Sequence, residues 1–170
     1  PGQVIYYKCC GLDNEKPIPK EDDAYKSIGH STTLPYNISD RRILMAYLLQ
    51  LSENVSHRAR NLGYAGKIVS LYVRTGEWEG MSFRRNLQYH TSATHHIYEA
   101  AKDLFEKNFN YSESVRLLGV SIGELHAGTV LVNLEDIMQG KDDKLRKLYE
   151  AVDRVNHNLQ DGIIRASALQ

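Results

Sequence analysis

One apolar stripe constrains the fold of this chain more than any other sequence feature. Apolar residues recur three or four positions apart after NISD, which supplies Ser39 or Asp40 as a helix N-cap. Their positions are Leu44, Leu48, Leu51, Val55, Ala59 and Leu62. Gly63 then ends the stripe, as glycine often does after a helix C-terminus. The pattern predicts a helix of about six turns that must bury one face against an apolar surface.

The segments around this helix carry the signals of β-strands. Residues 25–34, 67–74, 81–90 and 114–125 are rich in β-branched, aromatic or alternating apolar residues, and Pro35 is expected to end the first strand. A short TGEWEG loop joins the middle two segments and predicts a hairpin. One face of the strand at 81–90 has no apolar residue, so it must lie against water or a polar partner. That face carries Ser82, Arg84, Asn86, Gln88 and His90.

A second helix is predicted to begin near Ser92. Its buried stripe consists of Ile97, Ala101, Leu104 or Phe105, and Asn108 or Phe109. The order is therefore β-α-β-β-α-β, and two amphipathic helices need an apolar sheet face to cover. We predict an α+β fold: a four-stranded, antiparallel-type sheet with two helices on one face, plus a C-terminal helical tail. The tail helix is expected around Leu145, Leu148, Val152 and Val155.

The distribution of proline, glycine and charged residues divides the chain into three predicted parts. Residues 1–23 mix Pro, Gly and charge and are expected to form an extended linker, residues 24–127 the domain, and residues 128–170 the tail. The chain begins with Pro1 rather than Met, as a piece of a longer protein would. It has no signal peptide pattern and no apolar run long enough to span a membrane. The adjacent Cys9 and Cys10 favour reduced thiols, so we expect a cytoplasmic protein.

Charge is distributed unevenly although the net charge is zero. Between residues 26 and 96 the chain carries nine Lys and Arg against four Asp and Glu, a net charge of +5, and the remainder carries −5. Five of the seven histidines also lie in the basic part. Such asymmetry indicates a polyanion-binding face with acidic flanks.

Nothing in the sequence indicates a catalytic centre. There is no G-x-S-x-G, no P-loop and no dinucleotide fingerprint, and the carboxylates do not gather at strand ends. His90, His95 and His96 are close in sequence, but the adjacent pair points about 100° apart on a helix and no Cys or acidic ligand is near. The chain is therefore expected to be a binding module without catalytic residues and without a metal site.

Cations and small polar groups of the first strand and the hairpin suit phosphate oxygens. The groups are Lys26, His30, Thr32, Arg74, Ser82, Arg84 and Arg85, with the backbone amides of SIGHST. Ser27, Gly29 and Ser31 are small enough to let a nucleic-acid backbone approach closely. The alternative is that these are ordinary solvated strand residues, and the composition does not decide between the two interpretations.

Several segments, in one order, resemble the little finger (polymerase-associated) domain of Y-family translesion DNA polymerases, of the DNA polymerase IV or ImpB-MucB-SamB type. YKSIGHSTTLP is similar to the strand that opens this domain, and GLDNEKPIP to the end of the thumb and its linker. HRARNLGYAGKIVSLYVR resembles the helix-to-strand passage, and SVRLLGVSIGEL the final strand. KLYEAVDRVNHNLQDGIIRASAL is similar to the C-terminal tail.

This resemblance implies that the open sheet face lies along the template-primer duplex and holds its backbones during lesion bypass. Lys26, Ser27, Gly29, His30, Ser31 and Thr32 would contact DNA from the first strand, and Ser82, Arg84 and Arg85 from the hairpin. The catalytic palm is absent, so this chain would not polymerise alone, and Mg²⁺ is expected only in the missing catalytic domain. If about four phosphates are neutralised, log K should fall against log salt with a slope near −3.6.

Two other function classes remain open. Many members of the family carry a sliding-clamp motif, a Gln followed by aliphatic and aromatic residues, between the last strand and the tail. Here that place reads TVLVNLEDIM, which contains no Gln and no aromatic residue. The candidate clamp contacts are therefore Leu131, Leu134 and Ile137. A protein-interaction module that docks a clamp or repair partner through the tail is therefore the second hypothesis. An RNA-binding sheet is the third, and it would need exposed aromatic residues, for which Tyr72 is the candidate.

Overall fold

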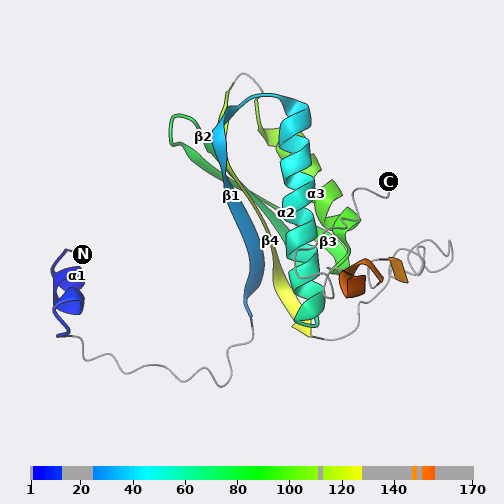
Figure 1. Ribbon diagram of the computed structural model, residues 1–170, viewed down its shortest axis with the longest axis horizontal. Helices are drawn as coiled ribbons and strands as arrows, with labels where there is room; N and C mark the ends of the chain where they lie inside the picture. Colours follow the sequence, from blue (N-terminus) through cyan, green and yellow to red (C-terminus); the bar gives the residue numbers. More distant parts are fainter. Residues whose placement is uncertain (1, 13–24, 111–112, 128–146, 149–150, 156–170) are drawn as a thin grey trace.

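A computed structural model of the chain describes residues 2–12, 25–110, 113–127, 147–148 and 151–155. The domain contains β1 (Ser27–Ile38), α2 (Arg41–Asn61), β2 (Tyr64–Thr75), β3 (Gly80–Thr91), α3 (Thr94–Asn108) and β4 (Val115–Ala127). The predicted β-α-β-β-α-β order is confirmed (Figure 1). No helix in these ranges is long and apolar enough to cross a membrane.

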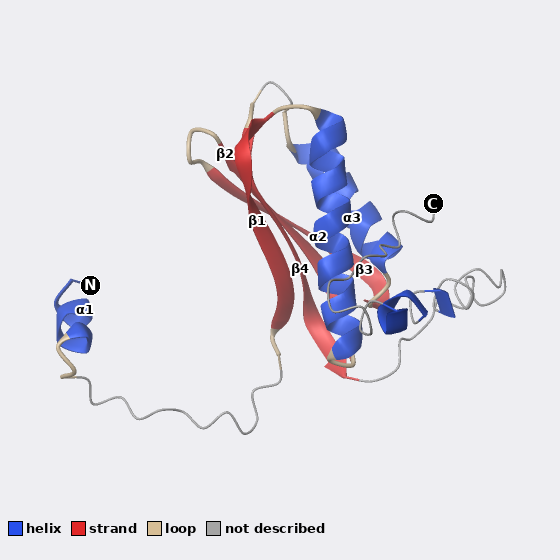
Figure 2. Cartoon of the chain, in the orientation of Figure 1, coloured by secondary structure: helices blue, strands red, loops and turns tan. Residues whose placement is uncertain are grey.

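The four strands form one sheet in the order β1-β4-β2-β3, and every neighbouring pair is antiparallel. Both helices cover the same face of this sheet (Figure 2). Helix α2 packs mainly on β1 and β4, and α3 packs on β2 and β3. The predicted α+β architecture is therefore confirmed, and no helix among the described residues covers the opposite sheet face.

The core lies between the helices and the sheet. The stripe on α2 is buried from Leu44 to Ala59, while Leu62, at the C-cap, is 36% exposed. On α3 the buried residues include Ile97, Ala101 and Phe105. The sheet contributes alternate residues to the same core, which are Val69, Leu71 and Val73 from β2 and Leu118, Val120 and Ile122 from β4. The period of two in these strands fixes which face looks at the helices.

Asp40, rather than Ser39, caps α2. Its carboxylate accepts a hydrogen bond from the Arg42 backbone N–H at 2.8 Å, whereas the Ser39 hydroxyl is directed to the Glu113 carbonyl at 3.4 Å. We expect Asp40→Ala to lower the free energy of unfolding by about 1 kcal/mol, because an orphan N–H of the first turn loses its acceptor. Urea denaturation followed by circular dichroism measures the effect. Ser39→Ala is the matched control, and an equal loss in both variants would contradict the assignment.

The predicted end of the first strand is wrong. Strand β1 does not end at Pro35 but continues to Ile38. Pro35 is tolerated because β1 is an edge strand, and its register with β4 shifts between Thr33 and Ile38, so no ladder bond needs the missing N–H.

The expected extended linker at residues 1–23 contains a helix, α1 (Gly2–Cys9), none of whose residues is buried. Every proline of that segment except Pro1 follows the helix, and Gly11 lies just beyond its end at φ +71°. Residues 13–24 lie outside the described residues, as do residues 145–146 and 149–150 of the predicted tail helix. Within the tail, 147–148 and 151–155 are helical.

Candidate nucleic-acid interface

The middle of the uncovered sheet face is built from three cross-strand rows. The central row runs from β1 to β3 through Gly29, Ser121, Ser70 and Arg84. The rows on either side are Ser27, Gly123, Ile68 and Asn86, and Ser31, Gly119, Tyr72 and Ser82. Residues paired in register project from the same face, so the β1 and β4 half of this surface carries only serine and glycine.

This small-residue half is tightly packed. A Cβ added at Gly29 would lie 2.8 Å from the Ser121 Cβ, and one added at Gly119 would lie 3.1 Å from the Ser31 Cβ. Any larger side chain at these glycines would have to displace its neighbour. The result is a shallow hollow, which we call the open-face hollow. It is lined by Lys26, Ser27, Gly29, His30, Ser31, Ile68, Ser70, Leu71, Tyr72, Ser82, Arg84, Gly119, Val120, Ser121, Gly123 and Glu124.

Two cations stand at the border of the open-face hollow. Lys26 immediately precedes β1 and Arg84 lies on β3, and both are exposed. Within the described part of the chain neither forms an ion pair, so both charges are available to an anion. Glu124, at φ +51°, is the acidic residue that lines the hollow.

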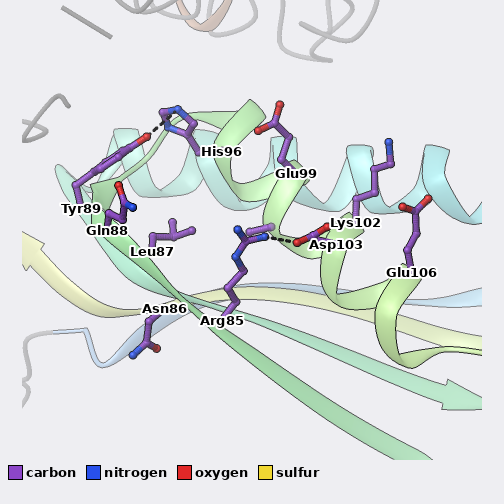
Figure 3. A pocket seen from close by; sticks show the side chains of 11 residues that line it. Arg85, Asn86, Leu87, Gln88, Tyr89, His96, Glu99, Lys102, Asp103 and Glu106 are labelled. Atoms are coloured by element: carbon purple, nitrogen blue, oxygen red, sulfur yellow. Dashed lines mark hydrogen bonds and ion pairs between the residues drawn. The ribbon is translucent and has the colours of Figure 1, made fainter. Parts of the chain in front are cut away.

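Arg85 is not in the hollow. Its register partner on β2 is the buried Val69, which places Arg85 on the helix side of the sheet. There its Nη1 donates to the Asp103 carboxylate on α3 at 2.6 Å (Figure 3). A hydrogen bond from Lys107 lowers the pKa of Asp103, and the Arg85 charge adds to this effect. The two arginines predicted together as DNA contacts therefore project from opposite faces of the sheet.

Three further predicted residues also lie apart from the hollow's centre. Arg74 is on the open face but stacks on Trp78, with its guanidinium carbon 4.7 Å from the ring centroid. Thr32 pairs in register with the buried Leu118 and does not line the hollow. His30 also has a core-side register but is exposed and lines the hollow from the free edge of β1.

The sequence analysis missed the contribution of β4. Gly119, Ser121 and Gly123 supply the middle of the hollow. The signal was present, because the small residues in LLGVSIGEL alternate with apolar ones at a period of two. Within the described residues, no group of three or more His, Cys, Asp or Glu side chains could hold a metal ion.

Comparison with known proteins assigns the fold to a family. A model described as the impB/mucB/samB family C-terminal domain matches residues 25–134. The chain belongs to this family. The resemblance to the little finger domain of Y-family polymerases is thereby confirmed, and the matched residues include every strand and both helices of the impB/mucB/samB domain described above.

Relatives of this impB/mucB/samB chain include two proteins named DNA polymerase IV. That of Moorella thermoacetica is 30% identical over 163 residues, which cover 96% of this chain and 40% of the relative. That of Acetivibrio thermocellus is 32% identical over 160 residues, covering 91% of this chain and 39% of the relative. The chain thus spans about 40% of the length of these relatives.

Solved structures share the fold. The post-insertion binary complex of Dbh DNA polymerase matches with a TM-score of 0.54 at 18% identity, covering 75% of this chain and 36% of that chain. DinB from Sulfolobus solfataricus matches with a TM-score of 0.51 at 17% identity, covering 78% and 36%.

Proposed function

We propose that the open-face hollow binds the sugar-phosphate backbone of a template-primer DNA duplex, without sequence specificity, as part of a lesion-bypass polymerase. The observation that supports this most directly is the serine and glycine surface of β1 and β4 beside two cations, Lys26 and Arg84, that form no ion pair with any described residue. Small side chains let a backbone approach the sheet, and cations and hydroxyls are the groups that contact phosphate oxygens.

The same surface argues against single-stranded RNA as the preferred ligand. Recognition of unstacked bases relies on aromatic side chains that stack on them. In the three cross-strand rows, Tyr72 is the one aromatic residue, and it is 40% exposed. A duplex held by its phosphates needs no such stacking.

A salt titration of the full chain with a fluorescein-labelled duplex tests the proposal. With Arg85 on the helix side, the open-face cations are Lys26, Arg74 and Arg84. Neutralising about three phosphates gives an expected slope of log K against log salt near −2.7, which is less steep than the slope of about −3.6 expected from sequence. Anisotropy with two duplexes of unrelated sequence should give equal affinities. An affinity that does not change with salt would overturn the proposal.

We further propose that the longer protein is a DNA-directed DNA polymerase whose Mg²⁺ ions bind in a separate catalytic domain. Support comes from the relatives named DNA polymerase IV, of which this chain covers only about 40%. Determining the sequence encoded before Pro1 tests this proposal. We expect that sequence to contain carboxylates at strand ends that can bind two metal ions. A sliding clamp also stays a predicted partner, because its candidate contacts Leu131, Leu134 and Ile137 lie outside the described residues.

A further inference from the structure

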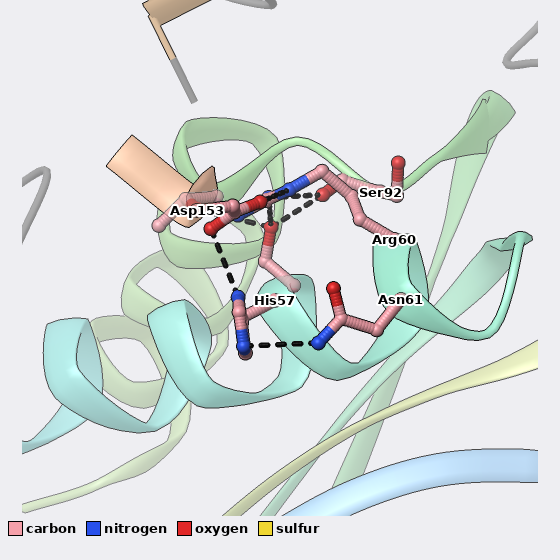
Figure 4. Close-up of polar contacts among 7 residues, drawn as sticks. His57, Arg60, Asn61, Ser92 and Asp153 are labelled. Atoms are coloured by element: carbon pink, nitrogen blue, oxygen red, sulfur yellow. Dashed lines mark hydrogen bonds and ion pairs between the residues drawn. The ribbon is translucent and has the colours of Figure 1, made fainter. Parts of the chain in front are cut away.

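Three hydrogen-bond donors on α2 converge on one carboxylate from the C-terminal segment. Arg60 Nε donates to Asp153 Oδ2 at 2.7 Å and Arg60 Nη2 to Oδ1 at 3.1 Å. His57 Nδ1 lies 2.9 Å from the same Oδ1 (Figure 4). A bidentate guanidinium contact with a third donor is among the strong and geometrically specific ways to bind a carboxylate.

The donors are positioned by the domain itself and not by the segment. Arg60 Nη1 donates to the Ser92 carbonyl at 3.2 Å and to the Ser56 hydroxyl. Asn61 Nδ2 donates to His57 Nε2 at 3.0 Å, which leaves the ring proton on Nδ1, facing the carboxylate. The Arg60 side chain is only 18% exposed. The contacts of Arg60 with Ser56 and Ser92 lie within the domain and do not depend on the carboxylate.

The segment itself offers two recognisable features. Val152 is buried, at 9% exposure, and Asp153 follows it. Burial acts to raise the pKa of Asp153, but the hydrogen bond and charge of Arg60, together with the hydrogen bond from His57, outweigh it and hold that pKa below its usual value. The group bound is therefore a carboxylate beside an apolar side chain, carried on a helical turn.

We propose that Arg60 and His57 form a receptor for an acidic helical peptide, which the chain's own Val152–Asp153 pair occupies in cis and a second peptide with the same pair occupies in trans. The receptor lies in the helix layer, not on the open face, so the inference does not rest on DNA binding. Residues 128–150 join β4 to the bound pair. A tethered ligand competes at an effective concentration on the order of millimolar, so an incoming peptide must outcompete it.

Binding of a fluorescein-labelled peptide of residues 147–155 to the full chain tests this receptor. We expect the Asp153→Asn chain to bind the peptide at least tenfold more tightly than the unmodified chain, because its cis ligand no longer competes. Adding Arg60→Gln to Asp153→Asn should abolish saturable binding, and adding His57→Gln should weaken it. Circular dichroism confirms that each variant is folded.

A control peptide carries asparagine in place of the aspartate that corresponds to Asp153. It leaves the protein unchanged, so its result does not depend on how any variant folds. We expect it to bind the Asp153→Asn chain at least tenfold more weakly than the parent peptide. Equal binding of the two peptides, no saturable binding to the Asp153→Asn chain, or equal affinities of the Asp153→Asn and unmodified chains would each overturn the proposal.

Discussion

The Ser121→Phe chain should bind duplex DNA about 100-fold more weakly than the unmodified chain, a loss of about 2.7 kcal/mol. Ser121 lies in the middle of the central row, between Gly29 and Ser70, where neither neighbour extends far above the sheet. A phenyl ring there occupies the space proposed for the sugar-phosphate backbone. The duplex would then move away from Lys26 and Arg84, and losing two phosphate contacts should reduce the magnitude of the salt slope by about 1.8.

Anisotropy titrations at several salt concentrations measure both effects. Ser121→Ala is the matched control, because it removes the hydroxyl without filling the hollow, and it should leave the affinity within about threefold. Thermal unfolding shows whether Ser121→Phe keeps the fold. A folded Ser121→Phe chain with unchanged affinity would show that the DNA does not lie over the central row.

Substitutions of two adjacent arginines, Arg84 and Arg85, should differ strongly in their effect on duplex affinity. We expect Arg84→Gln to weaken duplex binding about tenfold and to reduce the magnitude of the salt slope by about 0.9, since one phosphate contact is lost. Arg85→Gln should change neither quantity, because Arg85 lies on the helix side and is paired with Asp103. The two substitutions remove the same charge from neighbouring positions, so the comparison separates position from net charge.

The same titration as for Ser121→Phe reports the result. If Arg85→Gln weakened binding as much as Arg84→Gln, the overall charge of the domain rather than the open face would determine the affinity. The proposed interface would then be incorrect even though the fold is not.

The two helices and four strands of the domain could be predicted because local patterns determine them, whereas α1 was not predicted. The α2 stripe has a helical period, and the polar face at 81–90 has the period of a strand, so one face of the sheet had to be uncovered. The boundary at Pro35 could not be predicted, because proline is compatible with an edge strand and the edge position of β1 depends on where β4 pairs.

The binding surface was only partly predictable for a related reason. Successive side chains of β3 project from alternate faces of the sheet, so Arg84 and Arg85 lie on opposite faces. The sequence-based prediction grouped them by their charge and assigned both to DNA. Which residues of β1 and β4 lie side by side depends on register between strands far apart in the chain. The contact between Arg60 and Asp153 joins residues 93 positions apart, and no local pattern connects them.

The strand order also determines when the sheet can assemble. Strand β4 lies between β1 and β2 and is the last strand of the domain in the sequence. Both β1 and β2 must therefore wait for β4 before they can pair with it. During synthesis on a ribosome, the hairpin of β2 and β3 can pair early, but β1 lacks its partner strand β4 until residues 115–127 have left the exit tunnel. Nascent chains that stop before Val115 therefore expose the unpaired backbone groups of β1. At this stage of synthesis we expect chaperone binding to protect the chain most from aggregation.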